Sequence, residues 1–124
     1  LVVSAPGLAL ARVMERELGI PYAAAVPVGG EGYRRVGALL ERALETGISQ
    51  LPSDRPMAAQ GPGLLLVGDQ VAANSIRLAL RELGDRRPID VGSFFGLDEA
   101  LAAPGDLRLD READLIRALG GTPP

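Results

Sequence analysis

Four short loops carry the residues that could support chemistry in this chain. Each follows a short apolar run, and together they comprise residues 4–7, 27–30, 68–70 and 93–96. If the apolar runs are parallel strands, ligands should bind beyond the carboxyl ends of those strands. Two of the loops supply the residues that we expect to face a ligand. These are Pro27, Gly29, Gly30, Gly68, Asp69 and Gln70.

The loop at residues 68–70 precedes a predicted helix, where backbone N–H groups can hold an anion. The segment is not G-x-G-x-x-G, so the dinucleotide fingerprint is absent. The carboxylate of Asp69 would also repel a phosphate at close range. One interpretation therefore makes Asp69 a helix cap, with Asn74 and Ser75 as surface or sheet-packing residues. The other gives Asp69, Gln70 or Asn74 a role in ligand binding.

The glycine pair and the tyrosines also have structural interpretations. Gly29 and Gly30 either bring the backbone close to a ligand or form a loop that needs a positive φ. Tyr22 and Tyr33 are expected at the edge of the core with hydrated hydroxyl groups.

Carboxylates gather near the end of the chain, at Asp106, Asp110, Glu112 and Asp114. A site for a hard cation is conceivable, but the spacing is not that of an EF-hand loop. A solvated helix start, capped by Asp110, explains the cluster better.

The residue types that are absent exclude most catalytic schemes. The chain has no Cys and no His, and all thirteen basic residues are Arg. It therefore lacks thiolate and imidazole ligands, a Ser-His-Asp triad and a Schiff-base Lys. We predict no catalytic residue and no metal ligand, which favours a scaffold or a partial site. A net charge of −3 with scattered Arg argues against a nucleic-acid partner.

The elements that position these loops alternate between strand and helix. We expect strands at residues 1–5, 22–26, 63–68 and 89–93, and helices at 8–18, 32–45 and 71–83. A helical turn at 97–102 and a last helix after Asp110 follow. A Pro-rich connector at about residues 50–63 separates two β-α-β units. This order predicts one α/β domain over residues 1–124, a three-layer Rossmann-like domain with a mostly parallel sheet and helices on both faces.

The helix predicted at 71–83 has an apolar stripe that we expect to face the core. The stripe comprises Ala72, Ile76, Ala79, Leu80 and Leu83. The charged residues Arg77, Arg81 and Glu82 are expected on its outer side.

The sequence predicts a cytoplasmic location. No apolar run approaches the roughly twenty residues of a membrane span, and the first residues do not resemble a signal peptide. The sequence starts without Met inside a predicted strand, so we expect a piece of a longer protein.

Two stretches resemble the nitrogenase component 1 family, which includes nitrogenase, its cofactor-assembly scaffolds and the protochlorophyllide and chlorophyllide reductases. The first covers residues 7–22, ending in Gly19-Ile20-Pro21-Tyr22, and continues at residues 26–29. It is similar to a family segment in which a strand delivers a Pro-Gly loop towards an interdomain cavity. The second covers residues 65–70 and the helix up to Gly84.

The resemblance implies a domain of an oxidoreductase or assembly scaffold that frames a metal-cluster or tetrapyrrole cavity. The parent protein would hold an iron–sulfur or iron–molybdenum type cluster, or take a tetrapyrrole substrate. Its implied partners are the remaining domains, further subunits in a homo- or hetero-oligomer, and an ATP-dependent iron protein. The family's Cys and His ligands have no counterpart here, so the chain would supply no cluster ligand itself.

Two other functions fit the same residues. One is a small-molecule or nucleotide-binding module with its ligand at the loop after Val67. The other is an interdomain or oligomerisation domain that docks through a sheet edge and through Phe94 and Phe95. We interpret these phenylalanines as a hydrophobic staple or plug rather than a cofactor shelf.

Overall fold

A three-stranded parallel sheet organises the C-terminal half of the chain. The computed structural model describes residues 1–54, 58, 60–94 and 96–120. The strands β1 (Leu64–Val67), β2 (Ile89–Ser93) and β3 (Leu107–Arg108) lie in the order β1-β2-β3, and both pairs are parallel. Helix α3 (Gln70–Glu82) connects β1 to β2, and α4 (Glu112–Ala118) follows β3. The predicted mixed α/β class with parallel strands is therefore confirmed.

The N-terminal half holds two helices, α1 (Ala5–Leu18) and α2 (Gly29–Thr46). Its strand pairing is limited to two isolated parallel bridges, Val2 with Ala24 and Ala23 with Gln50. The backbone N–H of Val2 donates to the carbonyl of Ala23 at 2.8 Å, and Ala25 donates back to Val2 at 3.0 Å. The strands predicted at residues 1–5 and 22–26 therefore exist only as this short ladder.

Helix ends follow the local signals in the sequence. Ser4 caps α1 by accepting a hydrogen bond from the N–H of Gly7 at 3.2 Å. Gly19 and Gly47 end α1 and α2 in the left-handed conformation, both with φ of 66°; a residue with a side chain would be strained there. The last helix differs from the prediction, because its N-cap is Arg111 rather than Asp110.

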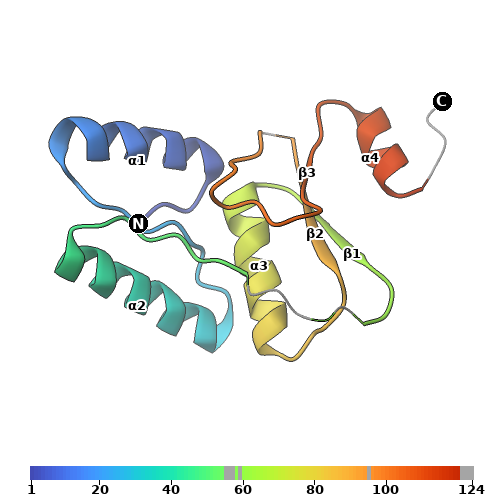
Figure 1. Ribbon diagram of the computed structural model, residues 1–124, viewed down its shortest axis with the longest axis horizontal. Coiled ribbons are helices and arrows are strands. Elements are labelled where there is room, and N and C mark those ends of the chain that lie inside the picture. The colour runs from blue at the N-terminus through green and yellow to red at the C-terminus, as the bar shows by residue number, and fades with distance from the viewer. Residues whose placement is uncertain (55–57, 59, 95, 121–124) are drawn as a thin grey trace.

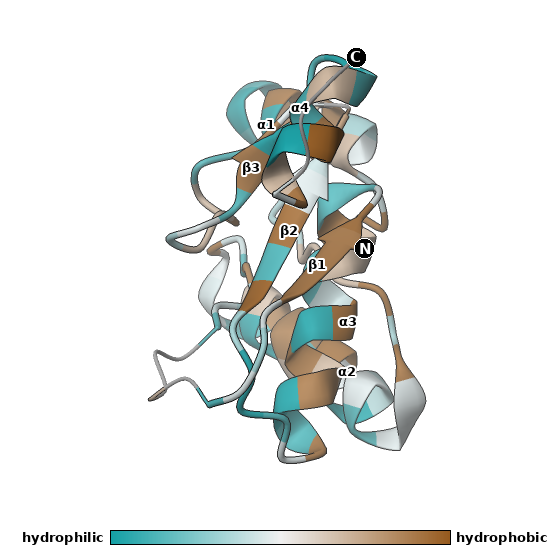
Figure 2. Ribbon diagram, turned by 90° about the vertical axis from the view of Figure 1, so that its right-hand side faces the viewer, coloured by the Kyte–Doolittle hydropathy of each residue, from teal (hydrophilic) through white to brown (hydrophobic). Residues whose placement is uncertain are grey.

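Helix α3 is central to the packing. It lies between the N-terminal helices and the sheet, and α4 lies beyond the sheet (Figure 1). Its residue Val71 belongs to the main hydrophobic cluster, which also contains Val2, Leu8, Ala11, Ala24 and Leu101. Strand β2 alternates hydrophobic and hydrophilic residues (Figure 2), and the hydrophobic ones, Ile89 and Val91, are buried. No helix in the described ranges is long and apolar enough to cross a membrane.

The predicted buried face of α3 is partly wrong. Ala72, Ala79 and Leu80 are half-buried, but the other two members of the predicted stripe are not. Ile76 and Leu83, expected in the core, are 40% and 85% exposed, whereas Arg77 retains only 1% of its accessible surface. The reason is that α3 contacts α2 as well as β1 and β2. A helix covered on several sides cannot be oriented from one apolar stripe.

Candidate functional site

Asp69 joins the two halves of the molecule at the start of α3. Its Oδ1 accepts hydrogen bonds from the N–H groups of Val71 at 2.9 Å and Ala72 at 3.2 Å. Its Oδ2 accepts from the N–H of Ala5, the first residue of α1, at 2.7 Å. The predicted helix-cap role is confirmed. Because the carboxylate already occupies the N–H groups of Val71 and Ala72, these two donors are not free to bind a phosphate at α3.

Gln70 links the same helix end to the loop after β2. It is 1% exposed; its Nε2 donates to the carbonyl of Asp98 at 2.9 Å, and its Oε1 accepts from the Asp98 N–H at 2.6 Å. The Asp98 carboxylate in turn forms a two-point ion pair with Arg12 of α1, with Nη2 and Oδ1 at 2.9 Å. The Arg12 hydrogen bond lowers the pKa of Asp98 against the opposing effect of burial.

The structure brings together half of the six predicted site residues. Gly68 follows β1 and donates its N–H to Gly92 at 3.0 Å, so Gly68, Asp69 and Gln70 form one continuous turn. This turn meets the first turn of α1 and the loop holding Asp98. We call this arrangement the Asp69 junction.

The other three predicted site residues lie elsewhere along α3. The N–H of Val26, next to Pro27, donates to Ser75 Oγ at 2.8 Å. Gly29 and Gly30 begin α2 and line a cavity of about 200 Å³ with residues from the end of α3, including Leu83. Gly29 has a φ of +69°, as its structural interpretation required. Because a helix of 13 residues is about 20 Å long, this cavity is separate from the Asp69 junction.

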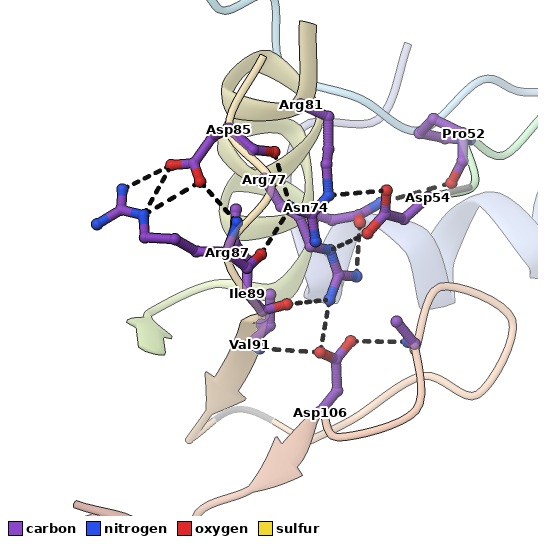
Figure 3. A network of polar contacts seen from close by, with 11 residues as sticks. Pro52, Asp54, Asn74, Arg77, Arg81, Asp85, Arg87, Ile89, Val91 and Asp106 are labelled. Carbon is purple, nitrogen blue, oxygen red and sulfur yellow. Dashed lines mark hydrogen bonds and ion pairs between the residues drawn. The ribbon is translucent and has the colours of Figure 1, made fainter. Parts of the chain in front are cut away.

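A buried polar network runs along α3, and sequence analysis missed it (Figure 3). Arg77 donates from Nη1 to Asp106 Oδ1 at 2.6 Å and from Nη2 to Asn74 Oδ1 at 2.8 Å. Asp106 also accepts from the N–H groups of Val91 and Ala103, each at 2.8 Å. The side chains of Arg77 and Asp106 are 1% and 0% exposed. This ion pair therefore fastens α3 to β2 and to the turn before β3.

The network extends from Arg77 towards the C-terminal end of α3. Asp54 lies between the two arginines of the helix, 3.9 Å from Arg77 Nε and 3.5 Å from Arg81 Nε. Arg81 Nη1 donates to the carbonyls of Asp85 at 3.0 Å and Arg87 at 2.7 Å. Hydrogen bonds from Arg87 lower the pKa of Asp85 to about 2. Arg77 and Arg81 thus hold three loops against α3, namely those that contain Asp54, Asp85 and Asp106.

One sequence signal could have revealed the network. Gln70, Asn74, Arg77 and Arg81 recur at spacings of four, three and four, which places them on one stripe of a helix. A polar stripe is ordinarily solvated, so the signal becomes informative only when the helix is known to be covered on several sides.

The acidic cluster is divided by the structure. The expectation of a solvated Asp106 is wrong, because Arg77 and two backbone groups hold it inside. Asp114, by contrast, is at the start of α4 as predicted and accepts from the N–H groups of Arg111 at 3.0 Å and Asp110 at 3.2 Å. Within the part of the chain that the structure describes, no three acidic side chains are placed to hold a metal ion.

The aromatic residues contribute little to the junction. Tyr22 packs partly buried against the main cluster, as expected for a core-edge residue, whereas Tyr33 is 70% exposed. Phe94 is exposed, and Phe95 lies outside the described residues.

Comparison with protein-family models finds no match, and comparisons with curated proteins and with solved structures find none either. The features of the structure that bear on function are the Asp69 junction and the α3 network. Both consist of carboxylates, amides and guanidinium groups that bind one another, an arrangement suited to fixing loops in place.

Proposed function

We propose that the chain is a noncatalytic α/β domain of a nitrogenase component 1-like oxidoreductase or cofactor-assembly scaffold. In this role it frames part of a metal-cluster or tetrapyrrole cavity and supplies none of the cluster ligands. The observation that carries the proposal is the Asp69 junction, where one carboxylate holds the starts of α1 and α3 together.

The junction suits a framing role because its polar groups are already satisfied. Asp69 binds three backbone N–H groups, Gln70 binds both polar backbone groups of Asp98, and Asp98 binds Arg12. Loops fixed in this way present a rigid surface, and at Gly68 only the backbone is presented. Such a surface orients a ligand through its shape and through polar groups that hold the ligating residues of the parent protein in position.

The residues of the junction do not fit as ligands of an iron–sulfur cluster. Such clusters are bound by Cys thiolates, with His as the main substitute, and the sequence contains neither. The two carboxylates nearest the junction, Asp69 and Asp98, are engaged in hydrogen bonds and an ion pair. Ligands would come from other parts of the parent protein.

The proposal includes a finer fold assignment. We infer that the Val2–Ala24–Gln50 ladder and the β1-β2-β3 sheet belong to a three-layer Rossmann-like domain in the parent protein. Its support is that both sets of strands are parallel. Helices α1 and α2 connect the segments of the ladder and α3 connects β1 to β2, as crossovers do in such domains. The cavity beside Gly29 and Gly30 would then be a second ligand-facing surface.

A second candidate function, self-association, is favoured by an apolar surface over residues 1–20. Large hydrophobic side chains there are between 38% and 66% exposed, namely Leu1, Val3, Leu10, Val13, Met14, Leu18 and Ile20. Several line a cleft of about 360 Å³ beside the Val2 bridge. Val2 pairs on one side only, within the described residues, so Val3 presents an open strand edge. Two copies can pair antiparallel through such an edge about a two-fold axis.

Three experiments distinguish the framing role, nucleotide binding and self-association. Reconstitution with iron and sulfide, with a four-cysteine apoferredoxin as positive control, is expected to leave the chain without iron; stoichiometric iron would overturn the framing role. Thermal stabilisation by a nucleotide at concentrations up to about 1 mM would favour a nucleotide-binding module instead. Sedimentation at high concentration tests self-association, which strictly monomeric behaviour would contradict.

A further inference from the structure

The face of the sheet opposite α3 contains a cleft with one carboxylate. Along β2, Ile89 and Val91 are buried towards α3, so the alternation of a strand places Asp90 on the opposite face. A cleft of about 300 Å³ lies there. It is lined by Gly63, Leu64, Leu65, Asp90, Leu107, Ala118 and Leu119. In Figure 2, α4 covers only one end of this face, and the ribbons of β1 and β2 below it face the viewer.

Asp90 has no counter-ion in the described part of the chain. None of the hydrogen bonds or ion pairs found there involves its carboxylate, whereas the carboxylates of Asp98 and Asp106 each pair with an arginine. The residue is half-buried, and burial followed by the charge of Asp106 raises its pKa, against a smaller opposing effect of Arg77. Arg77 cannot serve as its counter-ion because Asp106 and Asn74 already engage the guanidinium.

The backbone is shaped around this carboxylate. Gly105 has a φ of +101°, and a Cβ atom at that position would lie 2.4 Å from Asp90 Oδ1. Only glycine at position 105 therefore lets the backbone lie this close to the Asp90 carboxylate. Asp90 is held between this glycine and the cleft rather than extending freely into solvent.

The remaining walls of the cleft define the ligand. Ala118 and Leu119 form the end of α4, where the last backbone carbonyls give a partial negative charge. Leu65 and Leu107 supply apolar side-chain surface, because their strand partners, Asp90 and Gly92, lie on this face of the sheet. The basic groups of the neighbouring elements are neutralised locally, since Arg108 pairs with Asp110 and Arg117 with Asp114.

We propose that this cleft binds a small organic cation, a primary ammonium carried on a compact apolar body. The ammonium pairs with the Asp90 carboxylate and donates to the carbonyls at the end of α4, and the apolar body lies against Leu65 and Leu107. The cavity volume is at the lower end for small-molecule sites, which fits a short alkyl or cyclohexyl amine. The site is independent of the Asp69 junction and of the role proposed for it.

The test is a titration of the ¹⁵N-labelled chain at pH 7.5 with cyclohexylmethylamine, with cyclohexylmethanol as the uncharged analogue of the same shape. We expect the amine to shift the backbone amide signals of Leu65, Asp90, Leu107 and Leu119. We also expect the amine to bind at least tenfold more tightly than the alcohol. Equal binding of amine and alcohol would overturn the proposal. The absence of any shift of these signals at amine concentrations up to about 10 mM would also overturn it, because the affinity would then be weaker than millimolar.

A variant pair assigns the binding to Asp90. Asp90→Asn keeps the shape and removes the charge, and should weaken amine binding at least tenfold. Glu99→Gln removes an exposed carboxylate outside the cleft and should leave the affinity unchanged. Because the raised pKa means that ionised Asp90 lowers stability at neutral pH, the Asp90→Asn variant should melt at or above the parent temperature. Unchanged amine affinity in folded Asp90→Asn contradicts the site.

Discussion

Replacing Asp106 by Asn should remove a large part of the stability of this chain. The Asp106 carboxylate is fully buried and accepts three hydrogen bonds, from Arg77 at 2.6 Å and from the N–H groups of Val91 and Ala103 at 2.8 Å. In the variant, an NH₂ group replaces one acceptor and faces a donor, and the Arg77 guanidinium loses its nearest counter-charge. Asp54 compensates little at 3.9 Å from Arg77 Nε. Removing one partner of a buried ion pair costs about 3–5 kcal/mol.

Urea unfolding at pH 7, followed by far-ultraviolet circular dichroism, measures this loss. The matched control is Asp110→Asn, which removes the exposed partner of Arg108 and should change the free energy of unfolding by no more than about 0.5 kcal/mol. Adding Arg77→Met to Asp106→Asn removes the uncompensated charge, so the double variant should lose at least about 1 kcal/mol less than the sum of the single variants. A loss below about 1 kcal/mol in Asp106→Asn, or strict additivity, would refute the claim that this pair anchors α3.

Two further outcomes follow from the backbone and from Asp98. Gly105→Ala should lower the free energy of unfolding by about 1–3 kcal/mol, because φ is +101° and the new Cβ would meet the Asp90 carboxylate. Gly37→Ala, within α2 and with no atom within 4 Å of the added Cβ, should raise it by about 0.5–1 kcal/mol; urea unfolding that ranks the two in the opposite order would contradict the assigned backbone. Arg12→Gln should raise the pKa of Asp98 towards its ordinary value, as read from the carboxyl signal in an NMR titration, and an unchanged pKa would exclude the ion pair. Because the pKa is lowered in the folded chain, the stability from this pair is present above the unfolded pKa of about 3.9 and is lost as the pH falls below it.

Local signals in the sequence were sufficient to place most helices. Gly19 and Gly47 mark the ends of α1 and α2 because only glycine adopts the left-handed conformation there without strain. One of the two interpretations of Asp69, the helix cap, is confirmed, because a short carboxylate before an apolar helix satisfies free N–H groups. The apolar run from Leu64 to Val67 indicated a parallel strand, and β1 pairs in parallel with β2. The strand is not covered on both faces, however, because Val67 is 45% exposed.

The orientation of α3 could not be read from periodicity. An apolar stripe predicts the buried face only when the other faces are solvated, and α3 is contacted by a helix and by two strands. Arg77 and Asp106 are 29 residues apart in sequence, so nothing local to either one shows that they form a buried pair. Their charges alone favour exposure.

The candidate site was predicted only in part, because some of its contacts join residues that are distant in sequence. Gly68, Asp69 and Gln70 are adjacent in sequence and directly follow one predicted strand. Their common location at the end of that strand could therefore be predicted. Their link to Ala5 and Asp98 depends on how the two halves pack, which pattern reasoning does not determine. Gly29 was expected to share a cavity with them but lies beside the end of α3.

We propose above that this chain frames a cofactor cavity whose ligands lie outside it. The most direct measurement is the intact mass, sequence and iron content of the native polypeptide that contains these 124 residues, isolated with an antibody against α2. We predict a longer polypeptide that carries Cys residues and binds iron or a tetrapyrrole. A native polypeptide confined to these 124 residues, without iron and without a cofactor-binding partner, would contradict the account.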